Sequence, residues 1–340
     1  MPPSSKLSAA AIVDTTEQVW LPYDLPFLPT QTGFRPISAG KGILNANYTP
    51  FRLDYANVKT LHIINGMGVA LGDSVVGLSV LHWLKTQYPQ LAIVLYRSPH
   101  APAHVEEIYR LAPWAQVRLL PVPLAELTAA DGVVIDLADF MFRPAFDALP
   151  MVDFFLDSLG MEPGTMPAAA KANSWLAHIP RPPLPNDLPL RYTLLCPRAS
   201  SPLRTMPVEI TALLATHLLA SGQTVLGFGQ LGITGYRDVG AVSSGLPQLL
   251  ALIAGAERVI SVDSAIVHLA AGLGVPCTAL FMGIQPGLRV RDYPHCEAIQ
   301  LDQTGQLSGL HHADAGWQID HARQCWQSWQ SWVTTAMPTR

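Results

Sequence analysis

The sequence has few charged residues, few cysteines and no long run of purely apolar residues. Charged residues make up 14% of the chain, well below the roughly one quarter that is usual in soluble domains. Hydrophobic residues make up 49%, which is ample for globular cores and argues against disorder. The longest apolar stretch, residues 246–262, is interrupted by Gln248, Glu257 and Arg258, whereas a membrane span needs about 20 predominantly apolar residues. We therefore expect no membrane-spanning helix.

The small number of cysteines, the character of the N-terminal residues and the net charge restrict the expected location of the protein and its expected partners. Four cysteines without C-x-x-C spacing are poor candidates for zinc or paired disulfides, so we expect buried single thiols in a reducing cytoplasm. Met1–Asp14 has no basic start followed by an apolar run, so no signal peptide is expected. The net charge is −4 without any basic run, which argues against a nucleic acid polymer as partner. The cysteines are Cys196, Cys277, Cys296 and Cys325.

The length and the rhythm of the sequence predict two α/β domains. A chain of 340 residues fits two domains of about 150 residues each. Residues 1–57 are rich in proline and aromatics without a period, and we expect an irregular extension. Short apolar strands alternate with helical segments over residues 58–162 and again over 191–315, which predicts two parallel sheets covered on both faces. Seven prolines between residues 163 and 190 predict a linker.

The predicted elements are short strands that each lead into a helix. The strands are residues 60–64, 91–96, 117–120, 132–136, 192–196, 224–228, 258–262 and 277–281. The helices are residues 74–88, 105–111, 207–221, 246–255 and 265–272, followed by a C-terminal helix within 316–335. Ligands of such sheets bind beyond the carboxyl ends of the strands, so we expect the site residues in the loops that follow strands.

The first of these loops is the glycine-rich segment Gly66–Asp73. Its glycines, Gly68 and Gly72 among them, let the backbone turn tightly and approach a ligand. The spacing is not that of a dinucleotide fingerprint. Asp73 stands at the mouth of the predicted helix, where it is either an N-cap or a catalytic carboxylate. Its position alone leaves both interpretations open.

The second and third loops carry charged and hydroxyl side chains. Residues 196–207 lie between a strand and a helix, and their two hydroxyls and two arginines suit a phosphate; solvated surface arginines are the alternative. Over residues 259–276 a buried strand ends in Asp263 and Ser264 and leads into a helix of small apolar residues, which packs tightly on its sheet. His268 follows, either as a ligand of the site or as a core histidine.

These segments resemble glycosyltransferase family 9, which contains the bacterial ADP-heptose heptosyltransferases of lipopolysaccharide core assembly. Residues 260–276, followed by 279–287, resemble the C-terminal signature of that family. Residues 198–207 resemble its Ser-rich Lys-x-Trp-Pro phosphate loop, and Gly72–Asp73 resembles its N-terminal Gly-Asp motif. The resemblance covers roughly residues 60–290 in the expected order.

The resemblance implies a GT-B fold, with two facing Rossmann-like parallel-sheet domains, and an inverting transferase that needs no metal and no cofactor. The donor is a nucleoside-diphosphate sugar, with ADP-heptose as a candidate, and the acceptor is a glycan, lipid-linked or protein hydroxyl. The expected place is the cytoplasm, or the inner face of the membrane. By motif position Asp73 deprotonates the acceptor, Arg204 steadies the diphosphate and Asp263 holds the donor sugar. The other expected site residues are Arg198, Ser200, Ser201, Ser264 and His268, with Gly68, Gly72 and Gln285 in the loops.

The C-terminal helix, predicted within residues 316–335, carries four tryptophans: Trp317, Trp326, Trp329 and Trp332. Each can bury about 150–250 Å². Because the second sheet already has helices of its own, we expect this helix to cross back from the second domain and pack on the first. The alternative is that it completes the core of the second domain.

Three departures from the family pattern keep other functions open. Arg204 stands where the family has lysine, Met206 where it has tryptophan, and Ala265 where glycine is common; the N-terminal extension is also foreign to the core-heptose enzymes. A donor other than ADP-heptose and a protein acceptor are therefore open options. So are a nucleotide-sugar epimerase or hydrolase of GT-B fold, and a catalytically silent protein that binds a nucleotide sugar.

Overall fold

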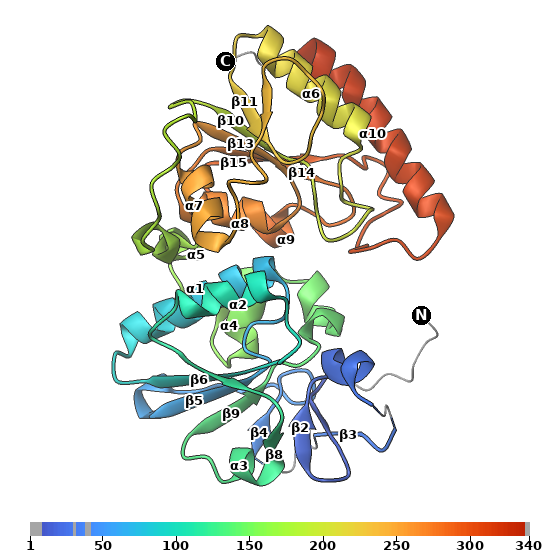
Figure 1. Cartoon of the computed structure of the whole chain (residues 1–340). Helices are drawn as coiled ribbons and strands as arrows, with labels where there is room; N and C mark the ends of the chain where they lie inside the picture. Colours follow the sequence, from blue (N-terminus) through green and yellow to red (C-terminus); the bar gives the residue numbers. More distant parts are fainter. Residues whose placement is uncertain (1–8, 30–31, 38–41, 337–340) are drawn as a thin grey trace. The chain divides into compact units, whose positions relative to one another are not determined.

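A computed structural model describes residues 9–29, 32–37 and 42–336, with the side chains of 331–336 left out. The chain divides between Lys171 and Ala172 into two compact units, unit 1 (residues 1–171) and unit 2 (172–340), and each is described by itself (Figure 1). The division falls inside the proline-rich segment expected as a linker. No helix in the described part is long and apolar enough to cross a membrane.

Unit 1 is built on a five-stranded parallel sheet with the order β4-β9-β5-β6-β7. Its helices α1, α2 and α4 lie on one face of this sheet (Figure 1). The strands are β4 (Ile43–Leu44), β5 (Thr60–Ile64), β6 (Ala92–Arg97), β7 (Gln116–Leu119) and β9 (Val133–Asp136). The helices are α1 (Leu71–Gln87), α2 (Ala103–Arg110), α3 (Leu124–Thr128), α4 (Met151–Ser158) and α5 (Ala168–Lys171).

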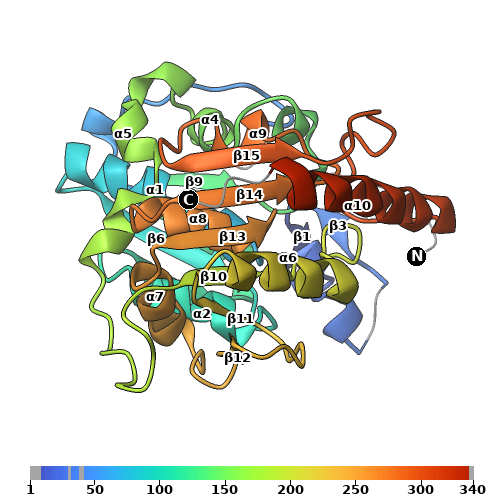
Figure 2. The same ribbon diagram turned by 90° about the horizontal axis from the view of Figure 1, so that it is seen from above.

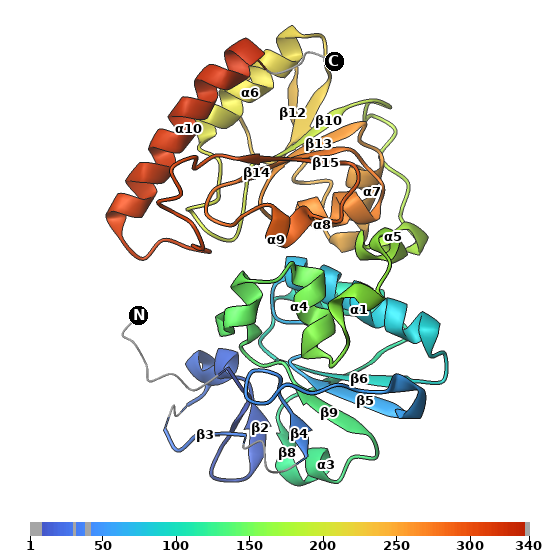
Figure 3. The same ribbon diagram turned by 180° about the vertical axis from the view of Figure 1, so that it is seen from behind.

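The N-terminal segment is part of unit 1, and the expectation of an irregular extension over residues 1–57 is wrong for the residues described. Strands β1 (Ile12–Val13), β2 (Gln18–Trp20) and β3 (Arg35–Pro36) pair with β8 (Val122–Pro123) in a small antiparallel sheet, seen in part in Figure 3. Its apolar side chains share a core with those of β5, β6 and β9. Strands of two or three residues are too short to show an alternating pattern, so no pattern in the sequence predicts them.

Unit 2 is built on a six-stranded parallel sheet with the order β12-β11-β10-β13-β14-β15. Helices α6 and α10 lie side by side on one face and α7 and α8 lie on the other (Figures 1 and 2). The strands are β10 (Thr193–Cys196), β11 (Val225–Gly227), β12 (Tyr236–Asp238), β13 (Arg258–Val262), β14 (Cys277–Phe281) and β15 (Cys296–Gln300). The helices are α6 (Val208–Ala220), α7 (Leu246–Ala254), α8 (Ala265–Gly272), α9 (Gly287–Val290) and α10 (Gly316–Ala336).

The C-terminal helix α10 packs on α6 of its own unit, which corrects the expectation that it crosses back to the first domain. Trp326, only 2% exposed, and Trp329 lie in the core cluster of unit 2, with their rings edge to face at 5.7 Å. Both α6 and α10 cover this face of the sheet of unit 2. The prediction from the sequence treated that face as already covered without the C-terminal helix. Trp317 is 53% exposed, and the side chain of Trp332 lies outside the described residues.

Candidate active site

The glycine-rich turn after β5 depends on the absence of a side chain at Gly68. Asn65, Gly66 and Gly68 have left-handed φ angles of 75°, 50° and 86°. A Cβ atom at Gly68 would lie 2.9 Å from the ring of Phe140 and 3.6 Å from the Cβ of Asp73. The turn is therefore pressed between the loop after β9 and the first turn of α1. Gly68 is where the sequence analysis expected it, in the loop.

Asp73 lies inside helix α1, and the N-cap interpretation left open above is wrong. The helix begins at Leu71 with Ala70 as its N-cap, so Gly72 and Asp73 are its second and third residues. Asp73 is half-buried. A carboxylate in the first turn of a helix is stabilised by the helix dipole and by the free N–H groups there.

Arg97, the last residue of β6, holds this turn in place, and the sequence analysis missed it. Its guanidinium is fully buried and donates from Nη1 to the carbonyl of Gly68 at 2.6 Å and to the hydroxyl of Tyr109 at 2.8 Å. It also lies 3.7 Å from the centroid of the Tyr109 ring and pairs with Glu106 at 2.5 Å. An arginine at the end of an otherwise apolar strand was the available signal.

Tyr109 and Ser74 extend this network to the start of α1. The Tyr109 hydroxyl donates to Ser74 Oγ at 2.9 Å, and Ser74 Oγ donates to the carbonyl of Ala70 at 2.9 Å. Burial is the main reason that the pKa of Tyr109 is raised, so the phenol keeps its proton. The network fixes the backbone on both sides of Asp73.

Two further carboxylates lie at the carboxyl end of the sheet: Asp136 is the last residue of β9, and Asp139 follows in the next loop. Asp136 is buried and accepts hydrogen bonds from the backbone N–H groups of Ala11 (2.9 Å) and Ala138 (2.8 Å) and from Asn45 Nδ2 (3.2 Å), so its role is structural. Asp139 has a left-handed φ of 49°. Its burial, with the charge of Asp136, raises its pKa to about 7. The carboxyl group of Asp139 therefore titrates near neutral pH beside the Gly68 turn, and the sequence analysis missed it.

In unit 2, Arg204 joins the two loops that the motifs singled out. Its Nη1 donates to the backbone carbonyl of Asp263 at 3.0 Å and to its carboxylate at 3.1 Å, and its Nη2 donates to Ser200 Oγ at 2.9 Å. The side chains of Arg204 and Asp263 are 17% and 7% exposed. Arg204 is thus hydrogen-bonded to two other residues predicted for the donor side, Ser200 of its own loop and Asp263 of the loop after β13.

The hydroxyls of Ser201 and Ser264 accept hydrogen bonds from backbone N–H groups. Ser264 caps α8, accepting from the N–H of Ile266 at 3.3 Å. Ser201 is buried, and its hydroxyl accepts from the N–H of Leu203 at 3.3 Å. Both residues shape the loops that carry Arg204 and Asp263.

A pocket of about 670 Å³ lies beyond the ends of β10 and β11. Arg198 and Ser200 line it from the loop after β10, Phe228 and Gln230 line it from the loop after β11, and Trp326 lines it from α10. Pockets of about 300–1,000 Å³ are typical of small-molecule sites. Arg198 supplies a cation on the pocket wall, and its role in donor binding stays a prediction.

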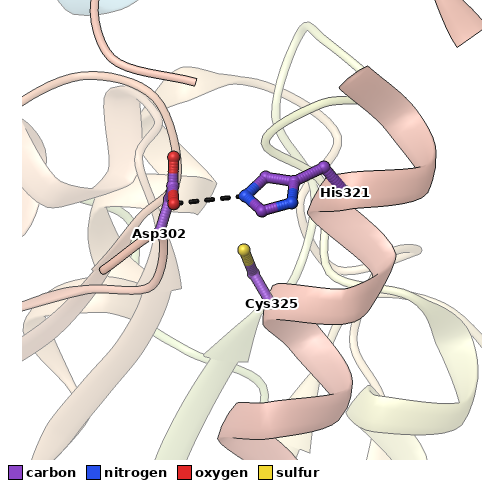
Figure 4. Close-up of side chains that lie close together, drawn as sticks. All are labelled: Asp302, His321 and Cys325. Carbon is purple, nitrogen blue, oxygen red and sulfur yellow. Dashed lines mark hydrogen bonds and ion pairs between the residues drawn. The ribbon is translucent and has the colours of Figure 1, made fainter. Parts of the chain in front are cut away.

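Gln285 lines a different, smaller pocket, of about 270 Å³, beyond β14 and β15. Asp302 lines the same pocket and lies beside His321 and Cys325 of α10 (Figure 4). One possible ligand atom of each lies within 4.8 Å of the others, so the three residues could hold a metal ion.

In this structure, Asp302 instead ties its own loop to α10. Its carboxylate accepts hydrogen bonds from the N–H groups of Thr304, Gly305 and Leu307 and lies 3.2 Å from His321 Nε2. Burial acts to raise the pKa of Asp302, but the hydrogen bond from the Thr304 hydroxyl, together with those from Leu307 N–H, His321 and Thr304 N–H, lowers it to about 2. Burial raises the pKa of the Cys325 thiol to about 11. The cluster is a fixed support for the second pocket.

His268 lies in α8, buried against Tyr293, with its Nδ1 at 2.6 Å from the Tyr293 hydroxyl. Burial lowers its pKa to about 4; Asp263 opposes this, and the charges of Arg289 and Arg204 add to it. The imidazole is therefore neutral at pH 7. His268 has the environment of a core histidine, and the charges of Asp263 and Arg204 also affect its pKa.

The match to a protein-family model includes the C-terminal motif of residues 260–276. Residues 241–298 match the model of "Glycosyltransferase family 9 (heptosyltransferase)". No curated protein matches the sequence. The solved structure of E. coli ADP-heptose lps heptosyltransferase II has 16% sequence identity and a TM-score of 0.51, over 81% of this chain and 98% of that one.

Two other solved structures are similar at lower scores. The family 9 glycosyl transferase from Veillonella parvula DSM 2008 has 13% identity and a TM-score of 0.49, over 84% of this chain and 99% of that one. E. coli heptosyltransferase WaaC with ADP has 16% identity and a TM-score of 0.49, over 78% and 98%. At these identities the likeness concerns the fold, and the first structure confirms the expected GT-B architecture of two parallel-sheet units. The family match adds that residues 241–298 are similar to family 9 glycosyltransferases.

Proposed function

We propose that this chain moves a sugar from a nucleoside-diphosphate sugar to a hydroxyl of a glycan, a lipid-linked or a protein acceptor, with inversion and without a metal. Heptose is the first candidate sugar, because the matching family model and the E. coli structure are of heptosyltransferases. The observation that carries the proposal is the hydrogen-bonded set of Arg204, Ser200 and Asp263. A cytoplasmic location, at the membrane face for a lipid-linked acceptor, is part of the proposal.

Arg204 is the group for the diphosphate, whose negative charge grows as the bond to the sugar breaks. A guanidinium donates in several directions at once, so Arg204 bonds Ser200 and Asp263 together, which a lysine ammonium would do less well. This gives the departure from the family's lysine a physical reason. Among the described residues, the buried Nε of Arg204 has no hydrogen-bond partner. An unsatisfied buried donor costs about 1–3 kcal/mol, and a phosphate oxygen that reached it would remove that cost.

Unit 1 supplies the base in this proposal. The carboxylate of Asp73 takes the proton of the acceptor hydroxyl as that oxygen bonds to the anomeric carbon. The bond from this carbon to the diphosphate breaks, and its electron pair stays on the leaving oxygen. Attack opposite the leaving group inverts the anomeric centre. The network of Arg97, Tyr109 and Ser74 keeps the backbone around Asp73 in one conformation.

The first test is a thermal-shift screen of ADP-, UDP-, GDP- and CDP-sugars. A ligand at 100 times its Kd stabilises the fold by about 2.7 kcal/mol, which appears as a rise in Tm. The donor that binds is then incubated with and without acceptors. Turnover that requires an acceptor supports the transferase. Turnover without any acceptor would replace it by an epimerase or hydrolase, and binding with no turnover would replace it by a silent binding protein.

A further inference from the structure

Tyr293 and Asn173 form a buried chain of hydrogen bonds that ends on His268. The Tyr293 hydroxyl lies 2.6 Å from His268 Nδ1, with the two rings nearly perpendicular at 86°. Asn173 Nδ2 donates to the Tyr293 hydroxyl at 2.8 Å and to the backbone carbonyl of His268 at 3.1 Å. Asn173 is fully buried, with a left-handed φ of 61°. All three residues belong to unit 2.

The hydrogen bonds decide where each proton lies. A carbonyl only accepts, so the bond to the His268 carbonyl fixes the amide of Asn173 with its NH₂ group on this side. The Tyr293 oxygen therefore accepts from Asn173, and its own proton is left for His268 Nδ1. The opposite arrangement, with a proton on Nδ1, would leave the buried hydroxyl hydrogen of Tyr293 without an acceptor, which is costly. Neutral His268 thus carries its proton on Nε2.

The proton on Nε2 has no acceptor among the described residues. Nε2 of His268 has no hydrogen-bond partner within the described part of the chain, and it is not among the fully buried atoms that lack one. The charges of Asp263 and Arg204 act on the imidazole, so it lies in the electrostatic field of the donor-side set. A neutral donor at this position adds a hydrogen bond without disturbing the charge balance between Arg204 and Asp263.

We propose that Tyr293 and Asn173 are positioning residues that hold His268 as a neutral Nε2–H donor for an oxygen of the nucleoside-diphosphate sugar. The ligand in this statement rests on the proposed function, whereas the position of the proton does not. The packing supports a fixed arrangement: a Cβ atom at Gly272 of α8 would lie 2.5 Å from the backbone oxygen of Asn173. Helix α8 and the Asn173 segment are therefore in direct backbone contact.

The test is long-range ¹H–¹⁵N NMR on the full chain with ¹⁵N-labelled histidine, which reports which ring nitrogen carries the proton. The His268→Gln variant identifies the signal. Wild-type protein should show the Nε2–H form of His268 throughout pH 6–8, and Tyr293→Phe should convert it to a mixture of forms. Tyr192→Phe is the matched control, because that buried hydroxyl donates to the carbonyl of Leu252 and leaves His268 untouched. A wild-type Nδ1–H form, or an unchanged form in Tyr293→Phe, would overturn the proposal.

A second variant tests the direction in which the hydrogen bonds from Asn173 through Tyr293 to His268 donate. In Asn173→Asp the carboxylate accepts from Tyr293, so the Tyr293 oxygen accepts from His268 and the proton moves to Nδ1. If Tyr293→Phe does not fold, this variant still decides the question: a proton that stays on Nε2 contradicts the chain of donors.

The third measurement is the affinity for ADP by calorimetry. Tyr293→Phe should weaken it about three- to tenfold, as for one neutral hydrogen bond, whereas Tyr192→Phe should not. A changed proton position with unchanged ADP affinity would overturn the role of His268 toward the ligand. Failure of the wild-type protein to bind ADP or any nucleotide sugar of the panel would count against the proposed function, and the proton position would still be decided by NMR.

Discussion

Replacing Arg204 by alanine removes the guanidinium that joins the loop after β10 to the loop after β13. The carboxylate of Asp263 is 7% exposed and, among the described residues, has its ion pair with Arg204. Breaking a buried pair on one side costs about 3–5 kcal/mol, because the other charge is left uncompensated. Arg204 itself is 17% exposed, so we expect the lower end of that range, a loss of about 3 kcal/mol in the free energy of unfolding.

The same change should weaken the binding of a nucleoside diphosphate. A hydrogen bond to a charged group contributes about 1.5–3 kcal/mol, which corresponds to a Kd higher by about 10- to 150-fold. Turnover should fall as well, because the charge that Arg204 meets grows in the transition state. Arg204→Lys keeps the charge and loses the second arm, so its stability and affinity should lie between those of the two other proteins.

The assay is urea unfolding of the wild type, Arg204→Ala, Asp263→Asn and the double variant, with ADP affinity measured on the folded proteins. The double-mutant cycle should show a coupling of about 1–3 kcal/mol. Arg237→Ala is the control: it removes an exposed pair with Asp187 and should cost less than about 1 kcal/mol. A coupling near zero would refute the ion pair, and unchanged ADP affinity would place Arg204 outside the site.

Three further predictions concern unit 1. Asp73→Asn should lower turnover by about 10²-fold with donor affinity nearly unchanged; near-normal turnover would show that Asp73 is not the base. Burial, with a neighbouring carboxylate, raises the pKa of Asp139 from 3.8 to about 7, so the folded state binds this proton more tightly and stability falls as the pH rises through that window. Asp139→Asn should lack this fall in urea unfolding at pH 4, 5.5 and 7; parallel pH dependences would contradict it. Gly68→Ala should cost more stability than Gly222→Ala, since both have a left-handed φ (86° and 83°) and only Gly68 faces a ring at 2.9 Å. Equal losses would mean that backbone strain alone decides.

The sequence predicted best those elements that are short and mostly apolar. Strands β5, β13 and β14 and helix α8 have the predicted bounds, because glycine, proline or polar residues lie at or within two residues of both ends of each element. The loop residues Ser200, Arg204 and Asp263 were found because the ends of parallel strands gather at one edge of a sheet. Their mutual hydrogen bonds were not foreseen, since the distances depend on how far each loop extends.

Other features depend on partners that are distant in the sequence. Arg97 and Tyr109 are unremarkable residues until β6 and α2 bring them to the carbonyl of Gly68. The prediction that helix α10 packs on the first domain was wrong. The apolar area of its tryptophans indicates that the helix is buried, but it does not indicate which surface buries it. Gln285 lies in the segment that resembles the family signature, but it lines the smaller pocket beside Asp302 and not the pocket of Arg198.

The short strand β4 has a consequence for any shortened form of this protein. It pairs in parallel with β9 through Ile43↔Val134 and Leu44↔Ile135 and thereby covers part of the edge that β9 would otherwise expose. A chain that began at residue 58 would leave the N–H and C=O groups of β9 open along that side and would strip Asp136 of two of its donors. Open strand edges pair with other chains. Such a fragment would tend to self-associate, and residues 9–57 would then be needed as much for solubility as for folding.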